Sequence, residues 1–360
     1  MSILDLRIQT VRNLSAVAMQ PSTRINIICG ENGSGKTSVL EAIHLLGLAR
    51  SFRTSQVRHL IQSGQPGCVA HAQVDSAGHR QPLGVERRLD GDLNIRFAGE
   101  NIDLSTLAGL LPLQVINSDT FQLLEGSPSI RRQFVDWGVF HADRRFIQCW
   151  RSFKRVLKQR NSLLKYGKID HRMRQVWDRE FVSYSEQLTA SRIDYLRQLQ
   201  PHFEAIIKRL LPDVEIALGF YRGWDRKADL DVVLEKAFQR ELQQGFTNAG
   251  PQRADLRIKA NGHSASERLS RGQKKLVVSA LKLAQGALFN QMSSRPCIYL
   301  IDDLPSELDS HHSRLFCEFL EESSNQCFIT CVDADALAYP WSTQTDVARF
   351  SIESGALSRV

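Results

Sequence analysis

The sequence of 360 residues has no long apolar run, no Cys-x-x-Cys pair and no low-complexity tract. A membrane-spanning helix needs roughly 20 apolar residues, so the lack of such a run excludes a spanning protein and a membrane partner is not expected. The first residues, MSILDLRIQT, do not follow the basic-then-apolar order of a signal peptide. The expected compartment is therefore the cytoplasm.

The seven cysteines do not form the pattern of a disulfide framework or of a common zinc site. Four of them lie within or beside apolar, strand-like runs: Cys29, Cys297, Cys327 and Cys331. This placement favours buried thiols in a reducing compartment. A zinc site built from Cys327 and Cys331 with the histidines at 311–312 stays a minor alternative, because the spacings fit no common pattern.

The composition is that of a folded globular chain rather than a disordered one, with 42% hydrophobic and 24% charged residues. The formal net charge of +7 permits binding to nucleic acid but does not establish it. The position of the charges is therefore more informative than their sum.

The apolar periodicity predicts an α/β domain built from both ends of the chain and interrupted by a helical insert. Strands are expected at 3–9, 24–29, 113–117, 254–260, 297–302 and 327–332, with antiparallel segments over 66–100 and a closing hairpin around Gly355. Helices are expected at 36–48, after Ser270 and at 313–322. The predicted domains are 1–125 with 212–360, and a helical insert over 126–211.

The segment GENGSGKT matches the phosphate-binding pattern G-x-x-x-x-G-K-[ST], and it lies between an apolar strand and a helix. Glycines let the backbone N–H groups converge on phosphates. Lys36 is predicted to reach the β- and γ-phosphates of ATP, and Thr37 to bind Mg²⁺. The predicted nucleotide-binding residues are Gly30, Glu31, Asn32, Gly33, Ser34, Gly35, Lys36, Thr37 and Ser38.

The run CIYLIDD (297–303) predicts a second part of the same site. Its apolar residues deliver Asp302 and Asp303 to the carboxyl end of a strand, where α/β sheets bind ligands. Asp302 is predicted to hold Mg²⁺ through water, and Asp303 to polarise the attacking water. Together with Lys36 they are the predicted catalytic residues. The alternative for Asp303 is that it only caps the next helix.

The segment LSRGQKKL (269–276) predicts the start of a helix, and therefore an anion site. The first N–H groups of a helix are unpaired and carry the positive end of its dipole. The chain already has a better phosphate site at Gly30–Thr37. The second anion site therefore needs another explanation.

These motifs, followed by SELD (306–309), resemble those of the ABC-type ATPases. More narrowly they resemble the RecF family, in the branch that also holds the structural-maintenance-of-chromosomes (SMC) proteins. The resemblance further rests on SFRT (51–54), GSPSIRRQFVDWG (126–138), LKQRN (157–161) and GPQRADLRI (250–258). The insert has no long heptad run and no Cys-x-x-Cys, which excludes a long coiled coil with a zinc hook.

The resemblance implies an ABC-type ATPase head with an antiparallel side sheet, in a homodimer that forms on ATP. Ser270, Gly272 and Gln273 of one chain would meet the γ-phosphate held by Lys36 of the other, with Asp309 at the dimer interface. It also implies binding to duplex or gapped DNA without sequence preference, and slow, DNA-stimulated hydrolysis that resets the dimer. Proteins of this family act with RecO and RecR to load RecA in recombinational repair and in maintaining replication gaps and forks.

The sequence departs from the ABC pattern at two positions of the predicted site. Asp303 stands where glutamate is usual, which predicts weak hydrolysis, and FITCVD offers Thr330 where transporters carry a histidine. The loop from Asn117 to Asp119, with Gln122 beyond it, takes the place of a loop that opens with glutamine. Arg12 and Asn13 match an Arg-Asn pair of the RecF family and are assigned to the adenine.

The predicted insert contains a stretch rich in basic residues and free of acidic ones before Asp170: Arg151, Lys154, Arg155, Lys158, Arg160, Lys165 and Lys168. An apolar face formed by Phe153, Val156, Leu157 and Leu164 accompanies it. Basic residues of this kind neutralise DNA phosphates. The scarcity of aromatic residues favours contact with a duplex backbone over stacking on single strands. The DNA-binding candidates are Arg151, Lys154, Arg155 and Lys158, and the alternative is a solvated helix face.

Arg131 and Arg132 serve either the same surface or the dimer interface, and the sequence does not separate these roles. The leading hypothesis for the whole chain is an ATP-dependent DNA-binding protein of recombinational repair. The alternative is a scaffold whose nearly inert ATP switch recruits repair partners. A small-molecule kinase would leave LSRGQ and SELD without a role.

Overall fold

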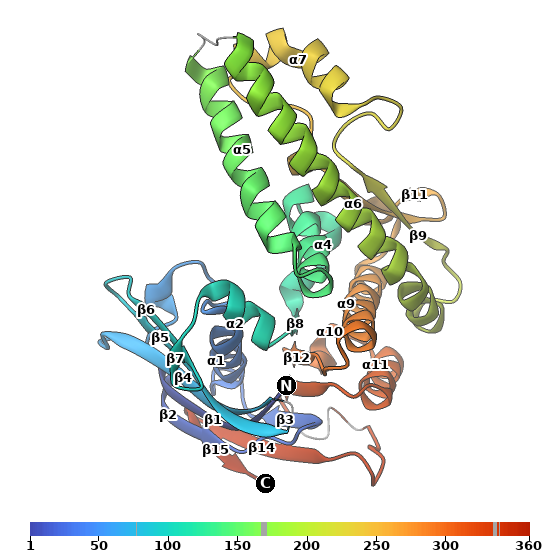
Figure 1. Cartoon of the computed structure of the whole chain (residues 1–360). Coiled ribbons are helices and arrows are strands. Elements are labelled where there is room, and N and C mark those ends of the chain that lie inside the picture. The colour runs from blue at the N-terminus through green and yellow to red at the C-terminus, as the bar shows by residue number, and fades with distance from the viewer. Residues whose placement is uncertain (77, 167–170, 334–336, 338) are drawn as a thin grey trace. The chain divides into compact units, whose positions relative to one another are not determined.

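The computed structural model describes residues 1–76, 78–166, 171–333, 337 and 339–360, with only the backbone at 171, 306 and 307. The chain divides into two compact units, which are described separately. Unit 1 comprises residues 1–120 and 275–360, and unit 2 comprises residues 121–274. Figure 1 shows the elements of both units.

Unit 1 contains a mainly parallel sheet whose strand order is β15-β14-β3-β13-β12-β8. Its strands are β3 (Ile25–Cys29), β8 (Leu113–Ile116), β12 (Ile298–Ile301), β13 (Gln326–Cys331), β14 (Val347–Glu353) and β15 (Ala356–Arg359). Every residue of β12 and β13 is buried. Burial on both faces explains why these strands are nearly continuous apolar runs.

A second, antiparallel sheet of unit 1 has the order β2-β1-β4-β5-β6-β7. Its strands are β1 (Ser2–Val11), β2 (Leu14–Met19), β4 (Gly67–Ser76), β5 (His79–Arg88), β6 (Leu93–Phe97) and β7 (Glu100–Asn101). Burial alternates along β4, as expected of a sheet with one face on the core.

Helix α1 (Lys36–Leu48) contacts strands of both sheets and is buried along most of its length. It therefore anchors the phosphate-binding loop that precedes it. The other helices with residues in unit 1 are α2 (Leu104–Leu110), α10 (Leu304–Glu307), α11 (Ser310–Glu322) and most of α9 (Arg271–Ser293), together with the 3₁₀ turns η1 (Val57–His59) and η2 (Ser118–Phe121).

Unit 2 combines helices with a small antiparallel sheet of order β11-β10-β9. Its elements are α3 (Gln122–Glu125), α4 (Pro128–Ala142), α5 (Phe146–Tyr166), α6 (His171–Leu210), β9 (Ile216–Tyr221), α7 (Leu230–Gln244), η3 (Pro251–Arg253), β10 (Asp255–Ala260), β11 (His263–Ser264) and α8 (Ala265–Arg268). Within the described residues no helix has both the length and the apolar character needed to cross a membrane.

Unit 2 extends beyond the predicted insert of 126–211, because residues 212–274 cluster with the helices rather than with the sheets of unit 1. The physical reason is packing: β10 contacts α4, and α7 contacts both α5 and α6. The predicted strands and helices of the α/β part are otherwise observed. Among the elements that the sequence pattern did not predict are β2, α2, β9 and α7.

Candidate nucleotide-binding site

The phosphate-binding loop runs from the end of β3 to the start of α1, as the motif predicts. Gly33 and Gly35 have φ of 82° and 119°, a region that side chains with a Cβ rarely adopt. At Gly30 the constraint is space, since a Cβ there would lie 2.3 Å from the carbonyl oxygen of Ile352 in β14. The backbone is thus held close to the sheet and is free to present its N–H groups.

The Lys36 side chain is buried and turns back over this loop. Its Nζ donates to the carbonyl oxygens of Gly30 at 2.5 Å and Glu31 at 2.9 Å. The ammonium group is therefore held at the mouth of the loop, where it can exchange these carbonyls for phosphate oxygens. That exchange would strengthen the interaction, because a hydrogen bond between two ionised groups is stronger than one to a neutral carbonyl.

Asp302 lies directly after β12 and accepts hydrogen bonds from two hydroxyl groups. The Thr37 Oγ1 donates to both of its carboxylate oxygens, at 2.9 and 3.1 Å, and the Thr330 Oγ1 donates at 2.9 Å. Burial raises the pKa of Asp302, while the hydrogen bonds from Thr330 and Thr37 and the charge of Arg53 oppose the rise. Hard oxygen ligands of this kind suit Mg²⁺, so the Thr37–Asp302 pair fits the predicted metal.

Asp303 adopts an unusual left-handed backbone conformation, with φ of 53° and ψ of 54°. Its N–H donates to the Thr330 hydroxyl at 2.8 Å, so Thr330 orients both aspartates. Asp303 occupies the N-cap position of α10, but its side chain does not make the capping hydrogen bond. Capping therefore does not account for the carboxylate, which lines the same cleft as Lys36.

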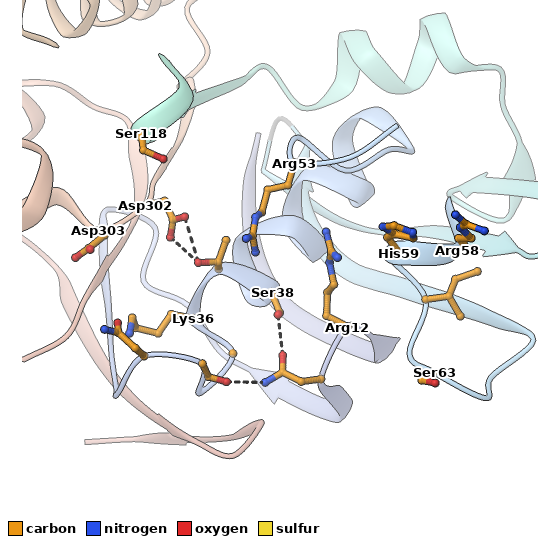
Figure 2. Close-up of a pocket in the computed structure, with 16 residues that line it drawn as sticks. Arg12, Lys36, Ser38, Arg53, Arg58, His59, Ser63, Ser118, Asp302 and Asp303 are labelled. Carbon is orange, nitrogen blue, oxygen red and sulfur yellow. Dashed lines mark hydrogen bonds between the residues drawn. The ribbon is translucent and has the colours of Figure 1, made fainter. Parts of the chain in front are cut away.

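The loop faces a cleft of about 910 Å³ lined only by residues of unit 1. Figure 2 shows Lys36, Asp302 and Asp303 on one side of it and Arg12, Arg58 and His59 on another. Of the predicted nucleotide-binding residues, Asn32, Gly33, Gly35, Lys36, Thr37 and Ser38 line this cleft. Gly30, Glu31 and Ser34 line a second cleft of about 800 Å³, which Asn32 and Gly33 line as well.

Arg12 and Asn13 were predicted to lie beside the adenine. In the structure both side chains bind residues of α1 or of the phosphate-binding loop. Arg12 forms a two-point ion pair with the fully buried Glu41, at 2.8 and 2.9 Å. The Asn13 amide donates to the carbonyl of Gly33 at 3.2 Å and accepts from the Ser38 hydroxyl at 2.7 Å. Both residues line the cleft, so the geometry is compatible with a ligand contact as well.

Five cleft residues were not predicted from the sequence: Arg53, Arg58, His59, Ile61 and Ser63. Arg53 extends toward Asp302 in Figure 2 and favours its ionised form. Arg53 belongs to SFRT, a motif that signalled the family but had no assigned role. Ser118 also lines the cleft. It belongs to the loop 117–119, which takes the place of the loop that opens with glutamine in the ABC pattern.

The segment LSRGQ forms the start of α9, and its first residues belong to unit 2. The Ser270 N–H donates to the Gln273 side chain at 3.0 Å, and the Gln273 N–H donates to the Ser270 hydroxyl at 3.3 Å. This reciprocal pair is a capping box, which stabilises the helix start by itself. Ser270 and Gly272 are exposed, so the helix start is also open to a ligand.

The SELD segment is only partly described, because the side chains of Ser306 and Glu307 lie outside the described residues. Asp309 is the N-cap of α11 and accepts from the His312 N–H at 3.0 Å. That hydrogen bond lowers the pKa of Asp309, with a further contribution from the His312 ring. The expected position of Asp309 at a dimer interface stays a prediction.

The candidate DNA-binding residues on α5 are all exposed: Arg151, Lys154, Arg155 and Lys158. Lys165 is exposed as well, and Lys168 lies outside the described residues. Arg160 differs, because its guanidinium is buried between Asp178 and Glu241, each at 2.7 Å. It also donates to the Thr247 hydroxyl, so this arginine fastens α5 to α6 and α7.

Arg131 and Arg132 make contacts within unit 2. Arg131 forms a two-point ion pair with Asp255 at 2.6 and 3.2 Å, and Arg132 donates to the carbonyl of Ala254 at 2.8 Å. Both contacts join α4 to the strand β10 or the residue before it. This geometry gives the two arginines a structural role within unit 2, and the roles considered from the sequence stay predictions.

Comparison with known proteins gives concordant results in sequence and in structure. Residues 2–347 match the family "RecF/RecN/SMC N terminal domain". The chain is 50% identical to the DNA replication and repair protein RecF of Pseudomonas syringae pv. syringae, over 100% of this chain and 98% of that protein. It is also 50% identical to the RecF protein of Azotobacter vinelandii, over 100% of this chain and 99% of that protein.

Among solved structures, the fold is similar to that of the recombination mediator protein RecF bound to ATP, with a TM-score of 0.88. That comparison covers 100% of this chain and 97% of the other, at 22% sequence identity. An SMC head bound to the C-winged helix domain of ScpA gives a TM-score of 0.60 at 16% identity, over 100% and 98% of the two chains. Together with the family match over residues 2–347, these two likenesses confirm the predicted fold, that of an ABC-type ATPase head.

Proposed function

Because the chain belongs to the RecF branch of the RecF/RecN/SMC family, we propose that it is an ATP-dependent DNA-binding protein of replication and repair. The observation that carries the proposal is the arrangement around Asp302. The loop lysine, the Thr37 hydroxyl and the half-buried carboxylate of Asp302 meet in one cleft, as binding of ATP with Mg²⁺ requires.

Each predicted group has a chemical role in this cleft. The N–H groups of the loop and Lys36 would bind the phosphates, and Thr37 with Asp302 would hold Mg²⁺, directly or through water. Asp303 would polarise the attacking water. Its carboxylate is one methylene shorter than glutamate, which is consistent with slow hydrolysis that serves as a switch.

Removal of the Lys36 ammonium tests the site. We expect Lys36→Met to weaken ATP binding about 100-fold, because a hydrogen-bonded charge contributes about 3 kcal/mol. The matched control is Lys154→Met, the same substitution at an exposed position of α5. Equal ATP affinity of Lys36→Met and the wild type, measured by calorimetry, would contradict the assignment.

We further propose that ATP brings two chains together, with Ser270, Gly272 and Gln273 of one chain against the γ-phosphate held by the other. The proposal is supported by the exposed helix start of α9 and by family membership. In this arrangement hydrolysis of ATP would let the two chains separate. By the same membership, the proposed partners are RecO, RecR and RecA, with duplex or gapped DNA as the site of action.

The exposed cations of α5 are the proposed DNA contacts. Charge reversal of Lys154, Arg155 and Lys158 to Glu should lower DNA affinity and reduce the slope of log K against log salt by about 3. The control reverses the exposed Arg226, Lys227 and Lys236 to Glu, which changes the net charge equally. Binding that is equal in the two variants would assign the contact to another surface.

The alternative is a scaffold whose ATP site is nearly inert and whose output is recruitment of partners. It is favoured by the aspartate at position 303. The rate of ATP hydrolysis with and without gapped DNA separates the two: stimulation supports the ATPase switch, and an unchanged rate supports the scaffold.

A further inference from the structure

Two thiols lie side by side directly behind the phosphate-binding loop. The Sγ atoms of Cys29 and Cys331 are 3.1 Å apart. The two residues end the parallel strands β3 and β13 and are paired in register. Neighbouring strands are about 4.8 Å apart, which lies within the range of Cα separations that a disulfide can bridge.

The two thiols differ in access. Cys29 is partly exposed and lines the second cleft, beside Asp333 and Arg349. Cys331 is buried behind it. Four of the other cysteines are also buried (Cys68, Cys297, Cys317 and Cys327), and Cys149 on α5 is the remaining partly exposed thiol. A small oxidant can therefore reach Cys29 first, and the Cys331 sulfur lies close enough to react with the oxidised Cys29.

Their surroundings give the two sulfur atoms different chemical roles. The hydrogen bond from Cys331 lowers the pKa of Cys29 and is the largest influence on it. Burial and the charge of Asp333 raise this pKa, and the charges of Arg349 and Lys36 lower it by smaller amounts. The same hydrogen bond and burial raise the pKa of Cys331. A partly exposed thiol of lowered pKa next to a second thiol is the usual arrangement of a redox-active pair.

We propose that Cys29 and Cys331 form a modification site for hydrogen peroxide that closes to an intramolecular disulfide and weakens nucleotide binding. The Cys29 thiolate attacks one peroxide oxygen, the O–O bond breaks, and Cys29 sulfenic acid forms with release of water after proton uptake. The Cys331 thiol then attacks the sulfenic sulfur, an S–S bond forms, and a second water leaves. Two thiols are oxidised and one peroxide is reduced to two waters.

The link to nucleotide binding rests on the proposed function. Disulfide formation shortens the sulfur–sulfur distance from 3.1 Å to about 2.05 Å. Cys29 directly precedes Gly30, which has no free space toward β14 and whose carbonyl binds Lys36. Cys331 directly follows Thr330, which positions Asp302. The movement therefore acts on the phosphate loop and on the metal ligand together.

The site itself is tested without ATP. Reduced full-length protein is treated with hydrogen peroxide, and the intact mass and the linked peptides are measured. The wild type should lose two thiols in a Cys29–Cys331 disulfide, and Cys149→Ser should behave identically. Cys331→Ala should instead stop at Cys29 sulfenic acid, trapped by dimedone, and Cys29→Ser should form neither product. Peroxide that leaves the pair reduced while oxidising Cys149 would overturn the proposal.

The consequence is tested on the same samples by calorimetry with ATP and Mg²⁺. The oxidised wild type should bind ATP about tenfold or more weakly, the loss of one charge-assisted hydrogen bond, and dithiothreitol should restore binding. Oxidised Cys29→Ser should bind as its reduced form does. A disulfide without an effect on affinity would overturn the coupling. Absence of ATP binding by the reduced protein would instead contradict the proposed function, while the mass test of the thiol pair would still hold.

Discussion

At the scale of single residues, Asp302 combines a functional gain with a cost in stability. Burial raises its pKa, so its ionised form is disfavoured in the folded protein even though Thr37 and Thr330 donate to it. The charge of a half-buried carboxylate whose pKa is raised is only partly compensated unless a cation approaches it. Mg²⁺ would supply that cation, which explains how the residue can be costly for folding and still useful.

Asp302→Asn should therefore stabilise the metal-free protein at pH 7, by about 1 kcal/mol. The sign follows from the raised pKa. Between the unfolded value of 3.8 and the higher folded value, the folded protein binds more protons than the unfolded chain, so stability falls as pH rises through this window. The gain from Asn should be complete above the folded pKa and should vanish below pH 3.8.

Thermal unfolding of both proteins over this pH range, without Mg²⁺, measures the effect. Asp309→Asn provides a control of opposite sign, because hydrogen bonds from His312 lower the pKa of Asp309. The stability it contributes is present above its unfolded pKa and is lost as pH falls through the folded one. An Asp302→Asn variant less stable than the wild type at pH 7 would show that the carboxylate is not strained.

Residues of short motifs could be predicted from the sequence because their chemistry is local. The order strand, glycine-rich loop and helix fixes the position of Lys36 and Thr37, and an apolar strand fixes that of Asp302. Arg58 and His59 could not be predicted, since their approach to the cleft depends on how η1 folds against the end of β1. Thr330 was noticed as a substitute for histidine, but its bonds to both aspartates required the structure.

At the scale of elements, α5 carries two kinds of basic residue on different faces. Lys158 and its neighbours Lys154 and Arg155 are exposed, whereas Arg160 is buried in the ion-pair cluster with Asp178 and Glu241. The sequence contained a signal for this difference. Arg160 follows Val156 by four positions and precedes Leu164 by four, so it lies on the apolar face of the helix.

Arg160→Ala should destabilise unit 2 by about 3–5 kcal/mol, because it leaves the fully buried carboxylate of Glu241 without its cation. Lys158→Ala, two positions away on the exposed face, should change stability by less than about 0.5 kcal/mol. Chemical denaturation followed by tryptophan fluorescence measures both. The double variant Arg160→Ala with Glu241→Gln should recover part of the loss, and a double variant less stable than Arg160→Ala would refute the ion-pair explanation.

At the scale of the whole molecule, the sequence did not reveal the boundary between the two units. The predicted insert ends at residue 211, whereas unit 2 extends to residue 274. Periodicity predicted most strands of unit 1 and the strand β10, but it did not predict β9 or α7, and the local pattern of β10 is the same as that of the strands of unit 1. Only packing against α4, α5 and α6 assigns them to unit 2. The proposed nucleotide-binding residues are thus split, with Lys36 and Asp302 in unit 1 and Ser270 in unit 2.

Because of this split, the oligomeric state decides whether Ser270 contributes to the nucleotide site of a second chain. If Ser270 completes the site of a second chain, an arginine at this position should block the dimer without affecting the first chain's own loop. We expect the wild type to double its mass on addition of ATP and duplex DNA, and Ser270→Arg to remain a monomer with unchanged ATP affinity. Ser183→Arg, at an exposed position of α6, should dimerise as the wild type does.

Sedimentation with and without ATP distinguishes the outcomes, because the helix start at Ser270 has two independent roles. Loss of the capping box alone would cost about 1 kcal/mol of stability, and the variant would still dimerise with ATP as the wild type does. A dimeric Ser270→Arg protein that binds ATP would therefore assign the motif to capping and would remove the second chain from the site. A monomeric variant of unaltered ATP affinity requires contact between Ser270 and the partner, since capping acts only within one chain.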